Sequence, residues 1–192
     1  MVFEGLDGAG KTTIARSVAE AMNAVYMTTP SPRVRAFRDG LLAALGASQE
    51  AAQLFYLATV FAASKEVDAH LISGRSVVLD RYFLSTQAYA EFRGSVLRID
   101  EVQRHLRPAD ITVFLDAPMD VRRPRIALRG ESISDRETLN PQADATLRRT
   151  HAARAELPVV GRFLAIDAGR LRPDEIVARV LEEIGARHVR ET

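Results

Sequence analysis

Short apolar runs alternate along the chain with longer segments whose apolar residues recur at helical spacing. The short runs predict five strands, at residues 1–3, 24–28, 76–79, 111–115 and 163–166. The longer segments predict helices at residues 11–23, 34–45, 48–73, 121–130, 142–157 and 173–184. Strands that alternate with helices favour an α/β fold, in which a five-stranded parallel sheet is covered by helices on both faces.

The longest helical segment, residues 48–73, is apolar nearly all round, and Ser48 stands where it can cap the helix. A helix of this kind is expected near the centre of the molecule. We find no linker, repeat or low-complexity tract in the 192 residues, so the chain is expected to form a single domain.

Residues 5–12 read Gly-Leu-Asp-Gly-Ala-Gly-Lys-Thr and fit the pattern G-x-x-x-x-G-K-[ST] between the first strand and the first helix. Lys11 can reach the β- and γ-phosphates of a nucleotide, and the Thr12 hydroxyl can ligate its Mg²⁺. The alternative is a glycine-rich turn with a chance lysine. Only two of the 26 basic residues are lysines, so an ammonium kept here indicates a nucleoside triphosphate site. Three glycines would let backbone N–H groups approach the phosphates: Gly5, Gly8 and Gly10.

The composition narrows the classes of partner. The net charge of +1 gives no reason to expect nucleic acid or an anionic membrane. The absence of cysteine excludes a disulfide scaffold and a thiolate metal site, and it is compatible with a cytoplasmic location. No run approaches the roughly 18 apolar residues of a membrane span, and the N-terminus lacks a signal-peptide pattern.

Further residues suited to phosphate chemistry follow two predicted strands. Asp80 and Arg81 follow the third strand, and Asp116 follows the fourth. Ligands of an open parallel sheet gather at the carboxyl ends of its strands, so we expect these residues near Lys11. Asp80 can hold a water on the metal, and Arg81 can bind the phosphate that receives the transfer. A structural ion pair at the strand end is the alternative for Asp80 and Arg81.

Two arginine-rich segments can supply more cations. Arg33, Arg35 and Arg38 lie near the start of the second helix and can hold a second anion, although a solvated basic face explains them equally well. Residues 122–137 begin with a dense set of arginines and continue as a polar segment, which we expect to be a mobile loop. We interpret this segment as a lid that folds over phosphates; an exposed basic helix is the alternative.

These motifs together resemble those of the thymidylate kinases. Residues 3–13 resemble the family's phosphate loop, and residues 80–82 with 85–89 resemble its second signature. Residues 54–56, 108–110, 115–116 and 125–136 follow in the family's order. The resemblance covers nearly the whole chain and implies a P-loop kinase fold with an arginine-rich lid, a homodimer, and ATP and Mg²⁺ as cofactors.

The resemblance also implies roles for individual residues on the donor side. Thr12 and Asp80 would face the metal. The groups expected to act in catalysis are Asp7, Lys11, Arg81, Arg125 and Arg129. The expected ATP site comprises Gly5, Asp7, Gly8, Ala9, Gly10, Lys11, Thr12, Thr13, Arg125 and Arg129, of which the last two belong to the lid.

On the acceptor side, the resemblance implies that Arg38 and Arg81 hold the 5′-phosphate and that Asp7 approaches the sugar or its phosphate. Phe55 would stack on the base, and Tyr89 would lie near the sugar's 2′ position, where it disfavours ribose. The remaining residues of the expected acceptor site are Thr59, Asp80, Ser85 and Thr86, of which Thr86 would lie beside the base edge.

Two positions depart from the family's pattern. The family typically shows Arg-Glu-Pro after the second strand, where this chain has Thr28-Thr29-Pro30. The family also places a base-binding arginine four residues after the stacking aromatic, where this chain has Thr59. A lost charged hydrogen bond costs roughly 1.5–3 kcal/mol, so these departures affect the recognition of thymine and leave the ATP side intact.

Three functions follow from these observations. The first is a nucleoside monophosphate kinase that phosphorylates dTMP or a related nucleotide. The second is a kinase of the same family that acts on another small molecule, such as a nucleoside or a specialised metabolite, which Thr59 and residues 28–29 favour. The third is a nucleotide-binding regulatory or motor module. It is disfavoured because Arg81, not an acidic residue, follows Asp80 and because no Asn-Lys-x-Asp sequence occurs.

Overall fold

Five parallel strands form one sheet in the computed structural model, which describes residues 1–188. They are β1 (Val2–Gly5), β2 (Val25–Thr28), β3 (Val77–Asp80), β4 (Ile111–Asp116) and β5 (Arg162–Asp167). Their order in the sheet is β2-β3-β1-β4-β5. The predicted α/β fold with five parallel strands is confirmed. Because β1 is the middle strand, the loop that follows it lies between the ends of β3 and β4.

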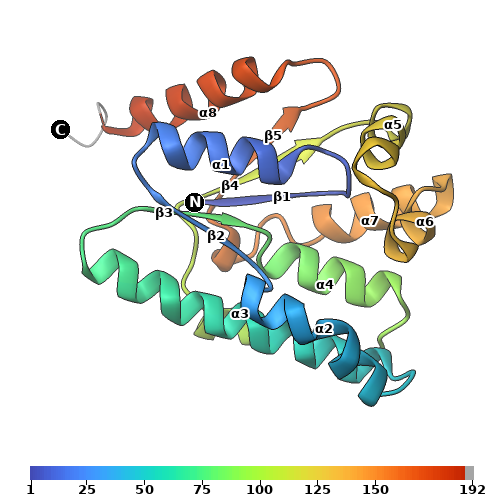
Figure 1. The fold of residues 1–192 in the computed structure, drawn as a ribbon. Coiled ribbons are helices and arrows are strands. Elements are labelled where there is room, and N and C mark those ends of the chain that lie inside the picture. Colours follow the sequence, from blue (N-terminus) through green and yellow to red (C-terminus); the bar gives the residue numbers. More distant parts are fainter. Residues whose placement is uncertain (189–192) are drawn as a thin grey trace.

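Helices cover both faces of this sheet (Figure 1). In Figure 1, α1 and α8 lie on one face, α3, α4 and α7 lie on the other, and α5 and α6 lie beyond the carboxyl ends of the strands. The helices are α1 (Lys11–Ala21), α2 (Pro32–Ala44), α3 (Gln49–Ile72), α4 (Phe83–Phe92), α5 (Met119–Arg129), α6 (Ile133–Thr138), α7 (Pro141–Ala152) and α8 (Pro173–His188). Two short 3₁₀ helices complete the fold, η1 (Asp100–His105) and η2 (Pro158–Val160).

The apolar residues of the strands pack against helices on both faces of the sheet. Phe3 and Val113 pack into the cluster that α1 and α8 cover, whereas their neighbours in sequence Val2 and Phe114 face the α3, α4 and α7 side. Successive side chains of a strand point to opposite faces, and both faces are covered, so these strands read as continuous apolar runs.

The prediction that the long helix is central is wrong. One side of α3 packs onto the sheet through Leu57, Val60 and Ala63. Its outer side stays at the surface, where Leu54 is 51% and Ile72 is 88% exposed. The helix reads as apolar all round because its outer side carries apolar residues that no element within residues 1–188 covers. The predicted Ser48 cap is confirmed: its side chain accepts from the Ala51 N–H at 3.1 Å.

The expected mobile loop after the arginine-rich segment contains a helix, α6. Ser132 and Asp135 cap this helix reciprocally, each side chain accepting from the other's backbone N–H. The sequence analysis also missed α4, which follows β3 directly. None of the helices within residues 1–188 is long and apolar enough to cross a membrane.

Candidate active site

The loop after β1 requires glycine for packing as well as for conformation. Gly5 has φ 136°, and a Cβ there would lie 2.4 Å from the Leu115 carbonyl oxygen. Gly8 has φ 81°, and its Cβ would lie 2.9 Å from the Arg122 carbonyl oxygen. Gly10 has φ 96° and is the N-cap of α1. The loop therefore packs closely against β4 and α5, and the positive end of α1 lies where the loop ends.

Lys11 is buried and curls back over this loop, where its Nζ donates to the Leu6 carbonyl at 2.7 Å. Burial and repulsion from Arg81 lower the pKa of Lys11 to about 8. The ammonium thus lies inside the concavity that the sequence predicted, within a cluster of charges. The neighbouring loop residue Ala9 is buried, and Thr13 is exposed on the first turn of α1.

Thr12 and Asp80 meet as the sequence predicted. The Thr12 hydroxyl donates to Asp80 Oδ2 at 2.5 Å, and the Tyr26 hydroxyl donates to the same oxygen at 3.2 Å. Asp80 Oδ1 is buried and accepts no hydrogen bond from the described residues. A buried carboxylate oxygen without a donor is costly, so the site favours a cation or a water at this point.

Arg81 pairs with Asp7, not with the adjacent Asp80. Its Nη2 donates to Asp7 Oδ1, and the Tyr89 hydroxyl donates to Asp7 Oδ2 at 2.8 Å. Burial alone would raise the pKa of Asp7, but the charges of Arg81 and Lys11 outweigh it and lower that pKa below its usual value. The phosphate loop and the end of β3 are therefore joined through one ionised carboxylate.

The expected base-binding residues lie on α3 and α4 and contact their own helices. The Thr59 hydroxyl donates to the Tyr56 carbonyl at 2.7 Å, and the Phe55 ring packs edge-on against Tyr56 at 5.2 Å between centroids. The Thr86 hydroxyl donates to the Tyr82 carbonyl at 2.9 Å. None of these contacts involves Asp7, Lys11 or Arg81.

Three expected phosphate-binding arginines have protein partners. Arg38 pairs with its neighbour Asp39 on α2, with 2.8 Å between Nε and Oδ1. Arg125 donates to the Ala168 carbonyl at 3.1 Å, and Arg129 pairs with Asp135 of α6. Arg129 still lies close enough to Asp7 to lower its pKa, after the larger effects of burial, Arg81 and Lys11.

Two residues that the sequence analysis did not single out hold the site together. Arg122 is fully buried, and its guanidinium donates to the Asp7 carbonyl at 3.2 Å and to the Asp144 carboxylate. It therefore fastens α5 to the phosphate loop and is not available as a lid residue. Glu4 of β1 is fully buried and accepts three hydrogen bonds from the start of α4. The sequence did contain a sign of this role, since Glu4 is an acidic residue within an apolar strand, directly before the loop.

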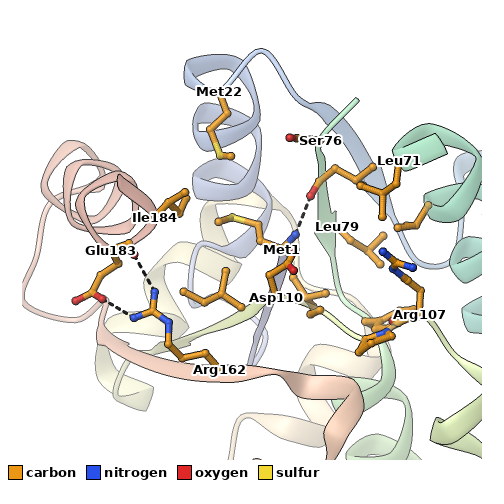
Figure 2. A pocket seen from close by; sticks show the side chains of 17 residues that line it. Met1, Met22, Leu71, Ser76, Leu79, Arg107, Asp110, Arg162, Glu183 and Ile184 are labelled. Atoms are coloured by element: carbon orange, nitrogen blue, oxygen red, sulfur yellow. Dashed lines mark hydrogen bonds and ion pairs between the residues drawn. The ribbon is translucent and has the colours of Figure 1, made fainter. Parts of the chain in front are cut away.

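A separate hollow of about 380 Å³ lies at the amino ends of the strands (Figure 2). Met1, Leu71 and Leu79 form much of its wall, and Arg162 on its edge is paired with Glu183. It is remote from the carboxyl ends of the strands, where Asp80 and the phosphate loop gather. The candidate active site is therefore the charged cluster and not this hollow.

The described residues contain no group of three or more His, Cys, Asp or Glu side chains that could hold a metal by themselves. A Mg²⁺ ion bound through one or two protein oxygens and the substrate phosphates needs no such cage. The Thr12 and Asp80 oxygens fit that mode.

Comparisons with known proteins find one family. Residues 3–180 match the family model described as thymidylate kinase. A thymidylate kinase of Akkermansia muciniphila is 30% identical over 197 residues, covering 97% of this chain and 91% of the relative. A probable thymidylate kinase of Thermoplasma acidophilum is 32% identical over 147 residues, covering 68% and 71% of the two chains. The solved thymidylate kinase of Candida albicans has the same fold, with a TM-score of 0.74 at 19% identity, covering 97% of this chain and 91% of that one.

Proposed function

The chain belongs to the thymidylate kinase family, and we propose that it transfers the γ-phosphoryl group of ATP to dTMP, giving dTDP and ADP. The observation that carries the proposal is the ion pair between Arg81 and Asp7 of the donor loop, which lies close enough to the Lys11 ammonium for that charge to lower the pKa of Asp7. Lys11 belongs to the donor loop, and Arg81 stands at the end of the neighbouring strand. Phosphoryl transfer depends on positioning and on cations around the transferred group, and this pair supports both.

On the donor side, the backbone of the phosphate loop and the positive end of α1 would hold the β- and γ-phosphates, with Lys11 bound between them. Thr12 and Asp80 would hold Mg²⁺, directly or through water, at the unpartnered Asp80 Oδ1. The metal would neutralise charge that develops between the donor phosphates.

On the acceptor side, Arg81 would bind the 5′-phosphate of dTMP. Its ion pair with Asp7 keeps the guanidinium extended toward the donor loop, where a phosphate can share it. Tyr89, which is hydrogen-bonded to Asp7, would lie beside the sugar, and Phe55 would stack on the base. Arg38 would leave its ion pair with Asp39 and bind the phosphate. The Thr86 hydroxyl donates to the Tyr82 carbonyl, so it can accept a hydrogen bond from the base N–H. Thr59, whose hydroxyl donates to the Tyr56 carbonyl, would lie beside the base without a hydrogen bond to it.

The lid would consist of the end of α5 together with α6, within residues 122–137. Arg122 and Ile126 are fully buried, so the first part of α5 stays attached to the phosphate loop. Arg129 belongs to the exposed end, and its pair with Asp135 connects α5 to α6. Closure over ATP would bring Arg125 and Arg129 to the phosphates, at the expense of their present protein partners. The whole chain would act as one kinase domain.

We further propose that the enzyme is a homodimer in the cytoplasm, where its nucleotide substrates are available. None of the residues of α2 is buried, and one side of this helix exposes Phe37 (70%), Leu41 (46%) and Leu45 (44%). Leu54 of α3 is a further exposed apolar residue (51%). We call Phe37, Leu41, Leu45 and Leu54 the α2–α3 apolar surface. A second copy would cover such a surface.

ADP release in the presence of ATP and Mg²⁺ tests the proposed activity. The acceptors are dTMP, dUMP, dCMP, dGMP and UMP, with unphosphorylated thymidine beside them and the Lys11→Ala variant in parallel. We expect dTMP to give the highest kcat/KM, UMP to be poor because Tyr89 disfavours ribose, and the variant to be inactive. Release that is independent of every acceptor, or absent with all of them while ATP still binds, would contradict the proposal.

A further inference from the structure

Glu4 is a carboxylate in the middle of the sheet, and all its hydrogen-bond partners belong to the first residues of α4. Its Oε1 accepts from the Tyr82 N–H at 2.9 Å and from the Ser85 N–H at 3.2 Å. Its Oε2 accepts from the Ser85 hydroxyl. Burial raises the pKa of Glu4, and the hydrogen bonds from Ser85 and Tyr82 oppose that rise. A fully buried carboxyl group without such donors would be very unfavourable, so Glu4 and the start of α4 stabilise one another.

Helix α4 has no cap of its own. Tyr82 occupies the N-cap position, and its side chain makes no capping bond. The first N–H groups of a helix lack partners within the helix, and the helix end attracts negative charge. Glu4 supplies such acceptors from a different element, so it fixes where α4 begins.

The residue immediately before this cap is Arg81, which has φ 69°. A non-glycine residue is disfavoured in this left-handed region and stays there only where its surroundings hold it. The Arg81 N–H donates to the Phe3 carbonyl at 2.9 Å, on one side of the turn. On the other side, the Tyr82 N–H belongs to the peptide that follows Arg81, and Glu4 binds it. The two bonds together hold the backbone turn that aims Arg81.

The same carboxylate also reaches the side chain of Arg81. Arg81 Nη1 donates to the Ser85 hydroxyl oxygen at 3.3 Å, and that hydroxyl donates to Glu4. Ser85 is therefore a link between Glu4 and the guanidinium. Its hydroxyl proton is already committed to Glu4, so it is not free to be donated to a substrate.

We propose that Glu4 is a positioning residue for Arg81, which it holds through the Tyr82 amide on the backbone side and through the Ser85 hydroxyl on the side-chain side. The inference rests on the proposed function, because it takes Arg81 as the group that binds the acceptor's phosphate. Glu4 itself touches no substrate in this account.

Two variants separate this role from a general contribution to folding. Glu4→Gln keeps the size of the side chain but has only one oxygen, so it cannot accept from all three donors. Ser85→Ala removes the link to the guanidinium and leaves the backbone turn bonded to Glu4. Ser95→Ala is the control, because the buried Ser95 hydroxyl likewise donates to a buried side-chain oxygen, that of Gln53, and accepts a backbone N–H, that of Leu97, at 3.4 Å, beyond the other end of α4.

The readouts are the KM values for dTMP and ATP, the Kd values for dTMP and thymidine, and amide hydrogen exchange at Tyr82 and Ser85. We expect Glu4→Gln to raise the KM and Kd for dTMP by roughly tenfold, the size of one weakened charged hydrogen bond. The ATP KM and the thymidine Kd should stay within about twofold, since neither involves Arg81 and the acceptor phosphate. Ser85→Ala should show the same pattern with a smaller change, and Ser95→Ala should show none.

An unchanged dTMP Kd, or an equal weakening of dTMP and thymidine, would overturn the inference. If Glu4→Gln does not fold, Ser85→Ala decides by the same comparison. Failure of the proposed function would look different: the wild-type protein would not bind or phosphorylate dTMP. Exchange at Tyr82 would then still test the hold on the Arg81 turn, because faster exchange in Glu4→Gln supports it and unchanged exchange contradicts it.

Discussion

Lys11 illustrates how a residue that the sequence identifies acquires its chemistry from its surroundings. Its pKa of about 8 results from burial and from the nearby charge of Arg81. In the folded protein without nucleotide, the ammonium form is lost as the pH rises through that value. ATP phosphates bind the ammonium form, so binding above the pKa requires the uptake of a proton.

The affinity for ATP should therefore decrease as the pH rises from 7.5 to 9.5, by up to about tenfold for each pH unit above the pKa of Lys11. Calorimetric titration with Mg·ATP across this range measures the slope. Lys11→Arg should bind more weakly but without the slope, because a guanidinium stays protonated throughout. An equal slope in both proteins would show that another group is responsible.

Thr59 replaces an arginine that the family typically uses to bind the base, yet the structure commits its hydroxyl proton to the Tyr56 carbonyl. We therefore expect Thr59→Val, which keeps the shape and removes the hydroxyl, to leave the dTMP KM within about twofold. Steady-state kinetics with dTMP and ATP test this expectation. A tenfold increase of the dTMP KM alone would mean that the hydroxyl turns to the base when the substrate binds.

At the scale of elements, the attachment of α5 to the phosphate loop depends on a buried ion pair. Arg122 is fully buried, and Asp144 of α7 is its carboxylate partner. Asp144→Ala would leave the guanidinium charge without that partner. The free energy of unfolding should decrease by about 3–5 kcal/mol, as measured by urea denaturation.

The matched control is Asp174→Ala on α8, which removes the partner of the exposed Arg172. An exposed pair contributes little, so the change should be within about 0.5 kcal/mol. Similar effects of the two substitutions would refute the claim that Arg122 anchors α5.

The sequence predicted the five strands and most helices because their apolar residues follow a clear period. It missed α4 because Phe83, Leu84, Ala88 and Tyr89 are buried on several sides of that helix, which removes the contrast between an apolar and a polar side. It missed α6 because that helix is short and polar, and it is supported mainly by the Ser132 cap. The periodicity of apolar residues therefore does not predict a helix that is buried on all sides, such as α4, or one that depends on its cap, such as α6.

The candidate site could be predicted in part, because the carboxyl ends of parallel strands lie at one edge of the sheet. That rule brought together the phosphate loop, Asp80 and Arg81. It could not show that Arg81 pairs with Asp7 instead of Asp80, since the pairing depends on the left-handed turn at Arg81. Nor could it reveal Arg122, because an arginine in a basic segment looks like a surface residue until α7 supplies the Asp144 carboxylate.

For the whole molecule, the α2–α3 apolar surface predicts association between two copies. Sedimentation velocity of the wild-type protein at micromolar concentration should show the mass of two chains. Phe37→Glu should shift the population to single chains, because it places a charge where an apolar side chain would be buried. Leu128→Glu is the control: Leu128 is 90% exposed on α5, away from that surface, and its substitution should change nothing. A wild-type protein that sediments as a single chain would contradict the dimer.

We expect the cluster of Lys11, Asp7 and Arg81 to direct the γ-phosphoryl group of ATP to a nucleotide and not to water. The most direct test follows the label from [γ-³²P]ATP in the presence of Mg²⁺ and dTMP, with products separated by chromatography. We predict that the label appears in dTDP, that its transfer requires dTMP, and that Arg81→Gln sharply reduces it. Label found only in inorganic phosphate, at a rate that dTMP does not change, would contradict the account.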